Sequence, residues 1–218
     1  MLIGASLLSM PLFGASKVLQ SLYMAGIDYW HIDVMDGNFV PNLALNANWV
    51  QSIKEEYPSV PMDIHFMTTE KALQNVANSF VATSPLWISF HNESISMVDS
   101  WIQSCKKNGI QPGLAISPET SIDTLQPFLS SLSFVLLMSV EPGFGGQHFR
   151  KETYSKIEAL QDIRTREGCS FRIQVDGGIQ LEEAKQLQKL NVDMIVIGSY
   201  LVHHPNPSEV LQSLSELS

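Results

Sequence analysis

Short apolar runs recur along the whole chain, and amphipathic segments lie between them. The runs are nearly continuous in apolar residues and do not alternate strictly with polar ones, which is typical of parallel strands covered on both faces. They predict eight strands, at residues 2–7, 29–34, 62–66, 87–91, 111–116, 134–139, 171–175 and 194–198.

Apolar residues between these runs repeat at the spacing of an α-helix. The first helical stripe ends before Gly26, which suits a helix exit, and the last follows Pro205 and Pro207, which suit a helix start. The stripes are Val18, Leu19, Leu22 and Tyr23; Leu181, Ala184 and Leu187; and Val210, Leu211, Leu214 and Leu217.

Eight strand–helix units of roughly 25 residues each predict a (β/α)8 TIM barrel that occupies residues 1–218 as a single domain. A doubly wound open sheet is the alternative, because periodicity alone does not show closure. The count of eight favours the barrel. In barrels of this kind, active sites gather at the C-terminal ends of the strands.

Four metal-capable side chains fall near such strand ends. His31 and Asp33 are two residues apart, so they point to the same face of the second strand. His65 lies on the third strand, and Asp176 lies where the seventh breaks into two glycines. Two imidazoles and two carboxylates form a plausible ligand set for one divalent metal ion. The chain therefore looks like an enzyme.

Three glycine-rich loops follow the last three predicted strands. Glycines let backbone N–H groups approach an anion closely, and barrels often bind phosphate after strands seven and eight. A single such loop is equally consistent with glycines that serve only a tight turn, whereas three at consecutive strands predict a phosphate-binding site. The residues are Gly143, Phe144, Gly145 and Gly146, then Gly177 and Gly178, and finally Gly198 and Ser199.

Composition narrows the class of partner. The chain has 13 Lys and Arg against 22 Asp and Glu, a net charge of −9, so neither nucleic acid nor an anionic membrane is expected as a partner. No apolar stretch approaches the roughly 20 residues needed to span a bilayer. Cys105 and Cys169 are isolated, which predicts reduced thiols. We expect a cytoplasmic protein.

Longer motifs resemble the ribulose-phosphate 3-epimerase family over nearly the whole chain. The most specific are HIDVMDGNFVPN at residues 31–42 and MSVEPGFGGQ at 138–147. Shorter matches are SLLS at 6–9, HFM at 65–67, VDGG at 175–178 and GS at 198–199. The resemblance implies a barrel of the ribulose-phosphate-binding type that interconverts ribulose 5-phosphate and xylulose 5-phosphate.

Residue roles follow from the resemblance at matching positions. It implies that His31, Asp33, His65 and Asp176 hold one divalent ion (Zn, Mn, Fe or Co), without an organic cofactor, and that Asp33 and Asp176 are the acid–base pair. Ser6 and His65 would contact the sugar, the glycine loops and Ser199 the phosphate, and Met35, Met67 and Met138 would line the metal site. The family also implies a homo-oligomer.

Epimerisation at C3 removes a proton beside a carbonyl and returns one to the opposite face. Two carboxylates are needed, one per face, while a metal ion stabilises the enediolate as a Lewis acid.

A hexulose 6-phosphate such as allulose 6-phosphate is the alternative substrate, because Met10 and Pro11 depart from the family pattern near the sugar-contacting serine. A catalytically silent sugar-phosphate-binding protein is the alternative from another functional class. Related decarboxylases of the orotidine-phosphate type need a Lys in a D-x-K-x-x-D motif. Met35 occupies that position here, which argues against decarboxylase activity.

Other polar residues favour structural interpretations. We expect Asp63 to be a hydrogen-bonded partner and not a ligand, Asp36 to cap the turn after the second strand, and His91 to be held by structural hydrogen bonds. The remaining histidines, His148, His203 and His204, are expected at the surface.

Overall fold

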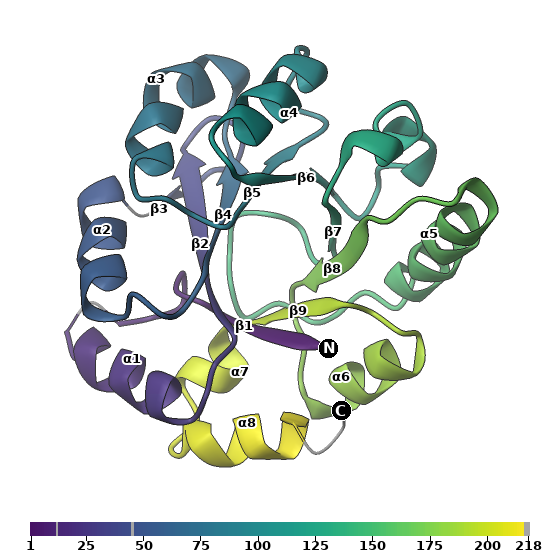
Figure 1. The fold of residues 1–218 in the computed structure, drawn as a ribbon. Helices are drawn as coiled ribbons and strands as arrows, with labels where there is room; N and C mark the ends of the chain where they lie inside the picture. The colour runs from purple at the N-terminus through teal and green to yellow at the C-terminus, as the bar shows by residue number, and fades with distance from the viewer. Residues whose placement is uncertain (12, 45, 216–218) are drawn as a thin grey trace.

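Eight parallel strands close into a barrel among the residues that the structure, a computed structural model, describes: 1–11, 13–44 and 46–215 (Figure 1). Strand β1 pairs with both β2 and β9, which closes the sheet and rules out the open doubly wound alternative. The strands are β1 (Leu2–Ser6), β2 (Tyr29–Asp36), β4 (Met62–Met67), β5 (Trp87–His91), β6 (Gln111–Ile116), β7 (Phe134–Met138), β8 (Arg172–Asp176) and β9 (Met194–Ile197).

Helices surround this barrel, and the first and last lie side by side next to β1 (Figure 1). They are α1 (Ala15–Met24), α2 (Ala47–Glu56), α3 (Glu70–Val81), α4 (Val98–Lys107), α5 (Thr153–Glu167), α6 (Leu181–Lys189), α7 (Ser199–Val202) and α8 (Pro207–Ser215). The predicted stripes lie on α1, α6 and α8, although Tyr23 is 41% exposed. Leu217 lies outside the described residues.

Two connections differ from the simple strand–helix repeat. The segment between β6 and β7 carries two short 3₁₀ helices, Ile122–Leu125 and Leu129–Ser131, and Pro127 between them prevents one continuous helix. The two-residue strand β3 (Leu43–Ala44) pairs antiparallel with the end of β2.

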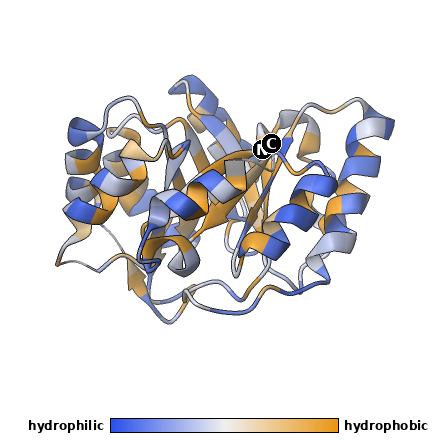
Figure 2. Cartoon of the chain, turned by 90° about the horizontal axis from the view of Figure 1, so that it is seen from below, coloured by the Kyte–Doolittle hydropathy of each residue, from blue (hydrophilic) through white to orange (hydrophobic). Residues whose placement is uncertain are grey.

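Side chains alternate between the barrel interior and the helix layer. On β7, Phe134, Leu136 and Met138 belong to the interior cluster, while Val135 and Leu137 pack in the layer beneath the helices. The helices turn apolar residues inward and polar residues outward (Figure 2). Burial on both faces explains why the strands appear in the sequence as continuous apolar runs.

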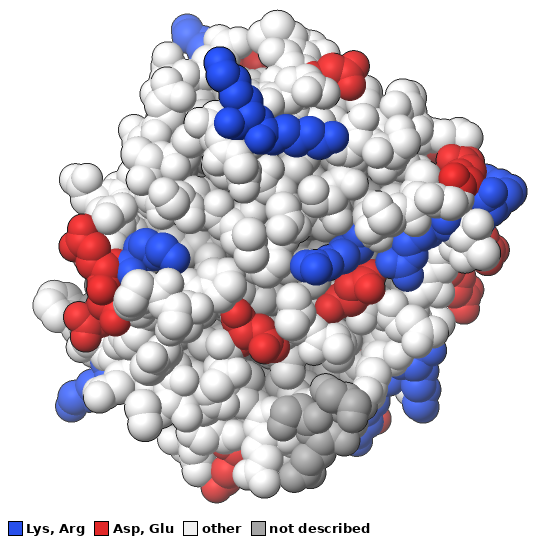
Figure 3. Space-filling model, in the orientation of Figure 1, with Lys and Arg blue, Asp and Glu red and all other residues white. Residues whose placement is uncertain are grey.

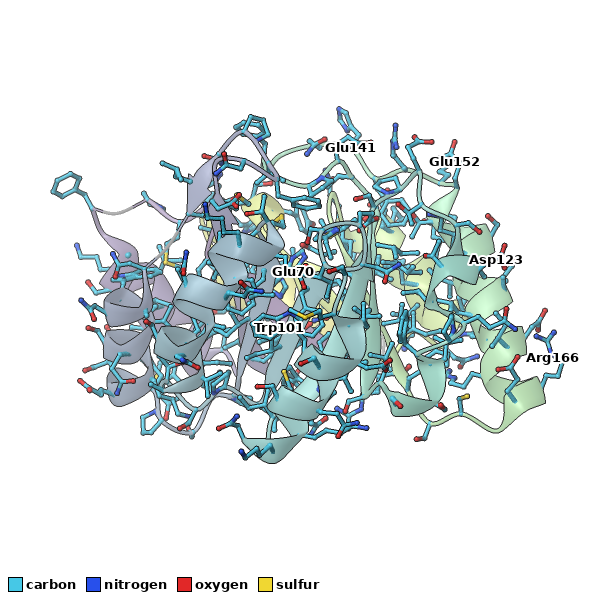
Figure 4. All side chains as sticks on the ribbon, turned by 90° about the horizontal axis from the view of Figure 1, so that it is seen from above. Glu70, Trp101, Asp123, Glu141, Glu152 and Arg166 are labelled. Carbon is cyan, nitrogen blue, oxygen red and sulfur yellow. The ribbon has the colours of Figure 1, made fainter. Side chains whose placement is uncertain are left out.

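The parallel arrangement brings all eight C-terminal strand ends to one rim. Glu141, which follows β7, and Glu152 lie at the upper side of Figure 4, whereas Arg166 at the far end of α5 lies at the lower side.

On the face seen in Figure 3, Lys and Arg are interspersed with Asp and Glu over a mostly uncharged surface. No helix among the described residues is long and apolar enough to cross a membrane.

Candidate active site

His31 and Asp33 lie inside the barrel on β2, as their two-residue spacing predicts. Register places His31 opposite Asp63 and Asp33 opposite His65 on β4. The Nε2 atom of His31 lies 3.3 Å from Oδ1 of Asp33, and the Nδ1 atom of His65 lies 3.4 Å from the same oxygen. Both imidazoles therefore converge on one oxygen of Asp33.

Asp176 completes the group from the end of β8. Its Oδ2 atom lies 3.7 Å from Nε2 of His31. One ligand atom from each of His31, Asp33, His65 and Asp176 falls within 4.8 Å of the other three. The barrel thus brings together the four residues that the sequence singled out.

The donor set fits a divalent metal ion. His31 Nε2 and His65 Nδ1 are buried and have no hydrogen-bond partner among the described residues. Burying unpartnered polar atoms costs free energy unless something binds them. Two imidazole nitrogens and two carboxylate oxygens that lie within 4.8 Å of one another could hold such an ion.

The two carboxyl groups have opposite acidities. Burial alone would raise the pKa of Asp33, but His31 and His65 outweigh burial and hold that pKa well below its usual range. Burial, assisted by the nearby Asp33 and Asp63 carboxylates, raises the pKa of Asp176 to about 7 against the opposing effect of His31.

The two imidazoles also differ. Burial lowers the pKa of His65 to about 4. Burial acts in the same direction on His31, but the Asp33 and Asp63 carboxylates overcome it and raise the pKa of His31 well above its usual value.

A cavity opens beside this group at the C-terminal rim. Asp33 and Asp176 line it, as do Ser6, whose hydroxyl donates to Oδ2 of Asp33 over 3.0 Å, and Ser9. His31 and His65 are fully buried behind the lining. All the predicted phosphate-loop residues line the cavity, together with the three predicted methionines: Gly143, Phe144, Gly145, Gly146, Gly177, Gly178, Gly198, Ser199, Met35, Met67 and Met138.

No Lys or Arg among the described residues lines this cavity. An anion held here would be bound mainly by backbone N–H groups, as in other glycine-rich nests. Gly178 shows how close the backbones come, because a Cβ atom there would lie 2.4 Å from the amide nitrogen of Phe149. Its φ of +62° also requires the left-handed region.

Hydrogen bonds fix the loops around the cavity. Asn42 Nδ2 donates to the carbonyl of Gly143 over 2.7 Å, which ties the loop after β2 to the loop after β7. The Ser139 hydroxyl lies within hydrogen-bond distance of the carbonyls of Asp176 and Gly177 and can donate to either, so the end of β7 sets the turn that follows β8.

The structural interpretations of Asp63 and Asp36 are confirmed. Asp63 Oδ2 accepts from Nδ1 of His31 over 2.8 Å. Asp36 accepts from the backbone N–H groups of Asn38 and Phe39 and also from Thr69. Hydrogen bonds from these backbone groups keep the pKa of Asp36 below its usual value, although burial opposes the shift.

The other histidines also behave largely as expected. His91 is buried, its Nδ1 lies 3.0 Å from Glu93 Oε2, and its ring stacks on His65 with centroids 5.0 Å apart. His148 and His203 are exposed and His204 is half-buried. His148 additionally lines the cavity, a position that its surface assignment did not anticipate.

Sequence reasoning missed Gln174. This residue is fully buried inside the barrel, and its Nε2 atom donates to Asp63 Oδ2 over 2.6 Å. Its place two residues before Asp176 was the available signal, since residues at that spacing share a strand face.

Comparisons with known sequences agree with this geometry. The family model described as "Ribulose-phosphate 3 epimerase family" matches residues 2–202. A ribulose-phosphate 3-epimerase of Escherichia coli strain K12 is 33% identical over 218 residues, covering 100% of this chain and 96% of that protein. One from Helicobacter pylori strain J99 is 32% identical over 217 residues, covering 100% and 98%.

Solved structures with low identity support the fold. A 3-hexulose-6-phosphate synthase from Salmonella typhimurium superposes with a TM-score of 0.74 at 15% identity, covering 100% of this chain and 98% of that one. KGPDC from Streptococcus mutans gives a TM-score of 0.69 at 13% identity, covering 99% and 95%. The full-length sequence matches decide the family: the chain is an isomerase that belongs to the ribulose-phosphate 3-epimerase family.

Proposed function

We propose that this chain interconverts D-ribulose 5-phosphate and D-xylulose 5-phosphate by moving a proton at C3. The observation that carries the proposal is the convergence of two imidazoles and two carboxylates beside a cavity lined by three glycine loops. The glycine loops suit the phosphate, and the carboxylates suit proton transfer at a carbon several atoms away.

His31, Asp33, His65 and Asp176 would hold one divalent ion, and the donor set suits Zn, Mn, Fe or Co without selecting among them. A bound ion supplies Lewis acidity to the substrate oxygens next to the reacting carbon. The unpartnered His31 Nε2 and His65 Nδ1 support this assignment. No organic cofactor is needed for the chemistry.

Asp33 and Asp176 would then exchange protons with C3 from opposite faces. The lowered pKa keeps Asp33 ionised, so that it carries no proton of its own, whereas Asp176, with a pKa of about 7 in the metal-free site, can hold one. Groups with such divergent acidities are suited to paired acid and base roles. The roles exchange when the reaction runs in reverse.

Ser6 and the methionines would assist the two carboxylates. The Ser6 hydroxyl donates to Asp33 Oδ2, the oxygen that does not face the imidazoles, and Ser6 would also contact the sugar. Met35, Met67 and Met138 lie at the cavity wall, where they would exclude water and strengthen electrostatic interactions.

The decisive experiment compares kcat/KM for ribulose 5-phosphate and allulose 6-phosphate with the same metal loading. The phosphate loops and the acid–base pair fix two ends of the substrate, so one extra CHOH group displaces C3, and small displacements cost about a hundredfold. We expect the pentulose phosphate to be preferred. A tenfold preference for the hexulose phosphate would reassign the substrate, and binding without turnover of either would show a silent sugar-phosphate-binding protein.

Assembly and location rest on the family alone. We propose that the single barrel domain assembles as a homo-oligomer in the cytoplasm. Light scattering of the purified protein would test the assembly, and a monomer at micromolar concentration would contradict it.

A further inference from the structure

A row of buried polar side chains lies beneath the four proposed ligands. Gln174 on β8, Tyr29 on β2 and Asp63 on β4 are all fully buried inside the barrel. Gln174 Nε2 donates to Asp63 Oδ2 over 2.6 Å and to the Tyr29 hydroxyl oxygen over 3.1 Å. The Gln174 amide thus joins two residues across the barrel that lie 111 and 145 positions before it in the chain.

The direction of each hydrogen bond in this row is fixed. The Tyr29 hydroxyl donates its proton to the carbonyl of Ile195 over 2.8 Å, so its oxygen can only accept from Gln174. The second N–H of the same amide then points at Asp63, because the reversed amide would set an oxygen against a carboxylate. Asp63 Oδ2 therefore accepts from Gln174 and from Nδ1 of His31.

This arrangement determines which nitrogen of His31 faces the site. With Nδ1–H committed to Asp63, Nε2 is left toward Asp33 and Asp176 without a hydrogen-bond partner among the described residues. In metal sites, a partner on the distal ring nitrogen orients the imidazole and fixes the tautomer. Asp63 supplies that partner, and Gln174 is what holds Asp63 in place.

We propose that Gln174 is a positioning residue for the metal site, which acts through Asp63 to keep His31 Nε2 aimed at the ion. Tyr29 supports it by fixing the orientation of the Gln174 amide. This inference rests on the metal site of the proposed function and adds a residue from a different layer of the barrel.

Packing alone does not account for Gln174. Its Oε1 atom and Asp63 Oδ1 are buried and have no hydrogen-bond partner among the described residues. Burying such groups unpaired is destabilising, and an apolar side chain of the same volume at position 174 would avoid that penalty. The presence of a polar side chain here is explained by what its N–H groups do for Asp63.

The test is metal affinity in the absence of substrate. Gln174→Met keeps the volume of the side chain but removes both donated hydrogen bonds. We expect Zn²⁺ and Co²⁺, measured by chelator competition, to bind about 10–100-fold more weakly. The visible spectrum of the Co²⁺-loaded protein should also change, because His31 is no longer held in one orientation.

Gln111→Met is the matched control. Gln111 on β6 also makes a hydrogen bond, accepting from Trp87 Nε1 over 3.0 Å, but it is not in the row beneath the ligands. Its loss should lower the unfolding temperature of the metal-free protein while leaving metal affinity within about twofold of wild type.

Wild-type affinity and an unchanged Co²⁺ spectrum in folded Gln174→Met would overturn the inference. If that variant does not fold, Tyr29→Phe decides in its place, because it removes only one oxygen and keeps the ring; a severalfold weaker affinity supports the inference and an unchanged one overturns it. Failure of the wild-type protein to bind metal would instead refute the metal site of the proposed function.

Discussion

An oxygen of Asp33 on β2 lies within 4.8 Å of an oxygen of Asp176 on β8, although β9 and β1 separate these two strands in the closed sheet. Despite this proximity, the pKa of Asp33 lies well below its usual range, and that of Asp176 is about 7. The imidazoles cause the first shift and burial the second, so the two carboxyl groups of the metal-free site differ widely in acidity.

We expect Asp33→Asn and Asp176→Asn each to abolish epimerisation, because each removes the proposed proton carrier on one face of C3. One variant should still exchange the C3 proton of one epimer with deuterated solvent, since the remaining carboxylate serves that face. Proton NMR in D₂O measures both quantities. Metal content must be measured in parallel, because either substitution also removes a proposed ligand. Epimerisation at the wild-type rate by either variant would refute the two-base assignment.

Metal removal should abolish activity. Chelation followed by add-back of Zn, Mn, Fe or Co, with elemental analysis, should restore turnover at one ion per chain. His31→Ala and His65→Ala should each prevent restoration, because each deletes a proposed ligand, whereas His204→Ala, outside the cluster, should behave as wild type. Full activity in a rigorously metal-free sample would contradict the site.

The strands and the ligand group could be predicted from the sequence because both depend on local periodicity. The predicted strand at 171–175 is displaced by only one residue from β8. His31 and Asp33 share a face because strand geometry has a period of two, and parallel strands bring His65 and Asp176 to the same rim.

Contacts that cross the barrel could not be predicted in this way. The bond from Gln174 to Asp63 depends on how the strands are staggered when the sheet closes, and no local pattern encodes that stagger. The tie from Asn42 to Gly143 likewise depends on two loops meeting over the rim, 101 residues apart.

Glu93 should contribute to stability in a pH-dependent way. Burial would raise its pKa. The hydrogen bond with His91, the electrostatic interaction with the same side chain and donation from the Ser117 N–H together lower the pKa to about 2. Because the folded value lies below the unfolded one, the stabilisation is present above about pH 4.5 and is lost as the pH falls toward 2.

Glu93→Gln should therefore be less stable than wild type at pH 7, by about 1–2 kcal/mol once solvent screening of this partly exposed group is allowed for. The difference should shrink as the pH falls from 5 to 2.5. Urea denaturation across this range measures it, and Glu158→Gln on the exposed face of α5 is the control. A difference that does not vary with pH would show that the carboxylate charge is not responsible.

The loop at 142–147 should close over phosphorylated substrate. Phe144 is 53% exposed, Gly145 and Gly146 are exposed, and the Gln147 side chain donates to the carbonyls of Glu141 and Phe144. We expect hydrogen exchange of its amides to slow when ribulose 5-phosphate is added, because the phosphate would engage the backbone N–H groups. The turn at 106–109, at the opposite end of the barrel, should show no change. Equal exchange in this loop with and without saturating substrate would exclude closure.

Alanine substitutions at two glycines distinguish the effect of backbone strain from the loss of the proposed phosphate-binding site. Gly168, which ends α5, and Gly178 both have φ above +60°, so an alanine at either position costs about 1–2 kcal/mol. A Cβ atom at Gly168 meets nothing within 4 Å, whereas one at Gly178 lies 2.4 Å from the amide nitrogen of Phe149 and 2.7 Å from the carbonyl of Gln147. Only Gly178→Ala must displace the backbone that lines the cavity.

We therefore expect Gly168→Ala to lower the free energy of unfolding and leave KM unchanged. Gly178→Ala should raise KM for ribulose 5-phosphate by at least tenfold and weaken inhibition by inorganic phosphate in parallel, because both ligands would use the displaced N–H groups. Steady-state kinetics and urea denaturation of the two variants separate the effects. If Gly178→Ala were destabilised like Gly168→Ala but kept wild-type KM and phosphate inhibition, the loop after β8 would not be part of the phosphate site.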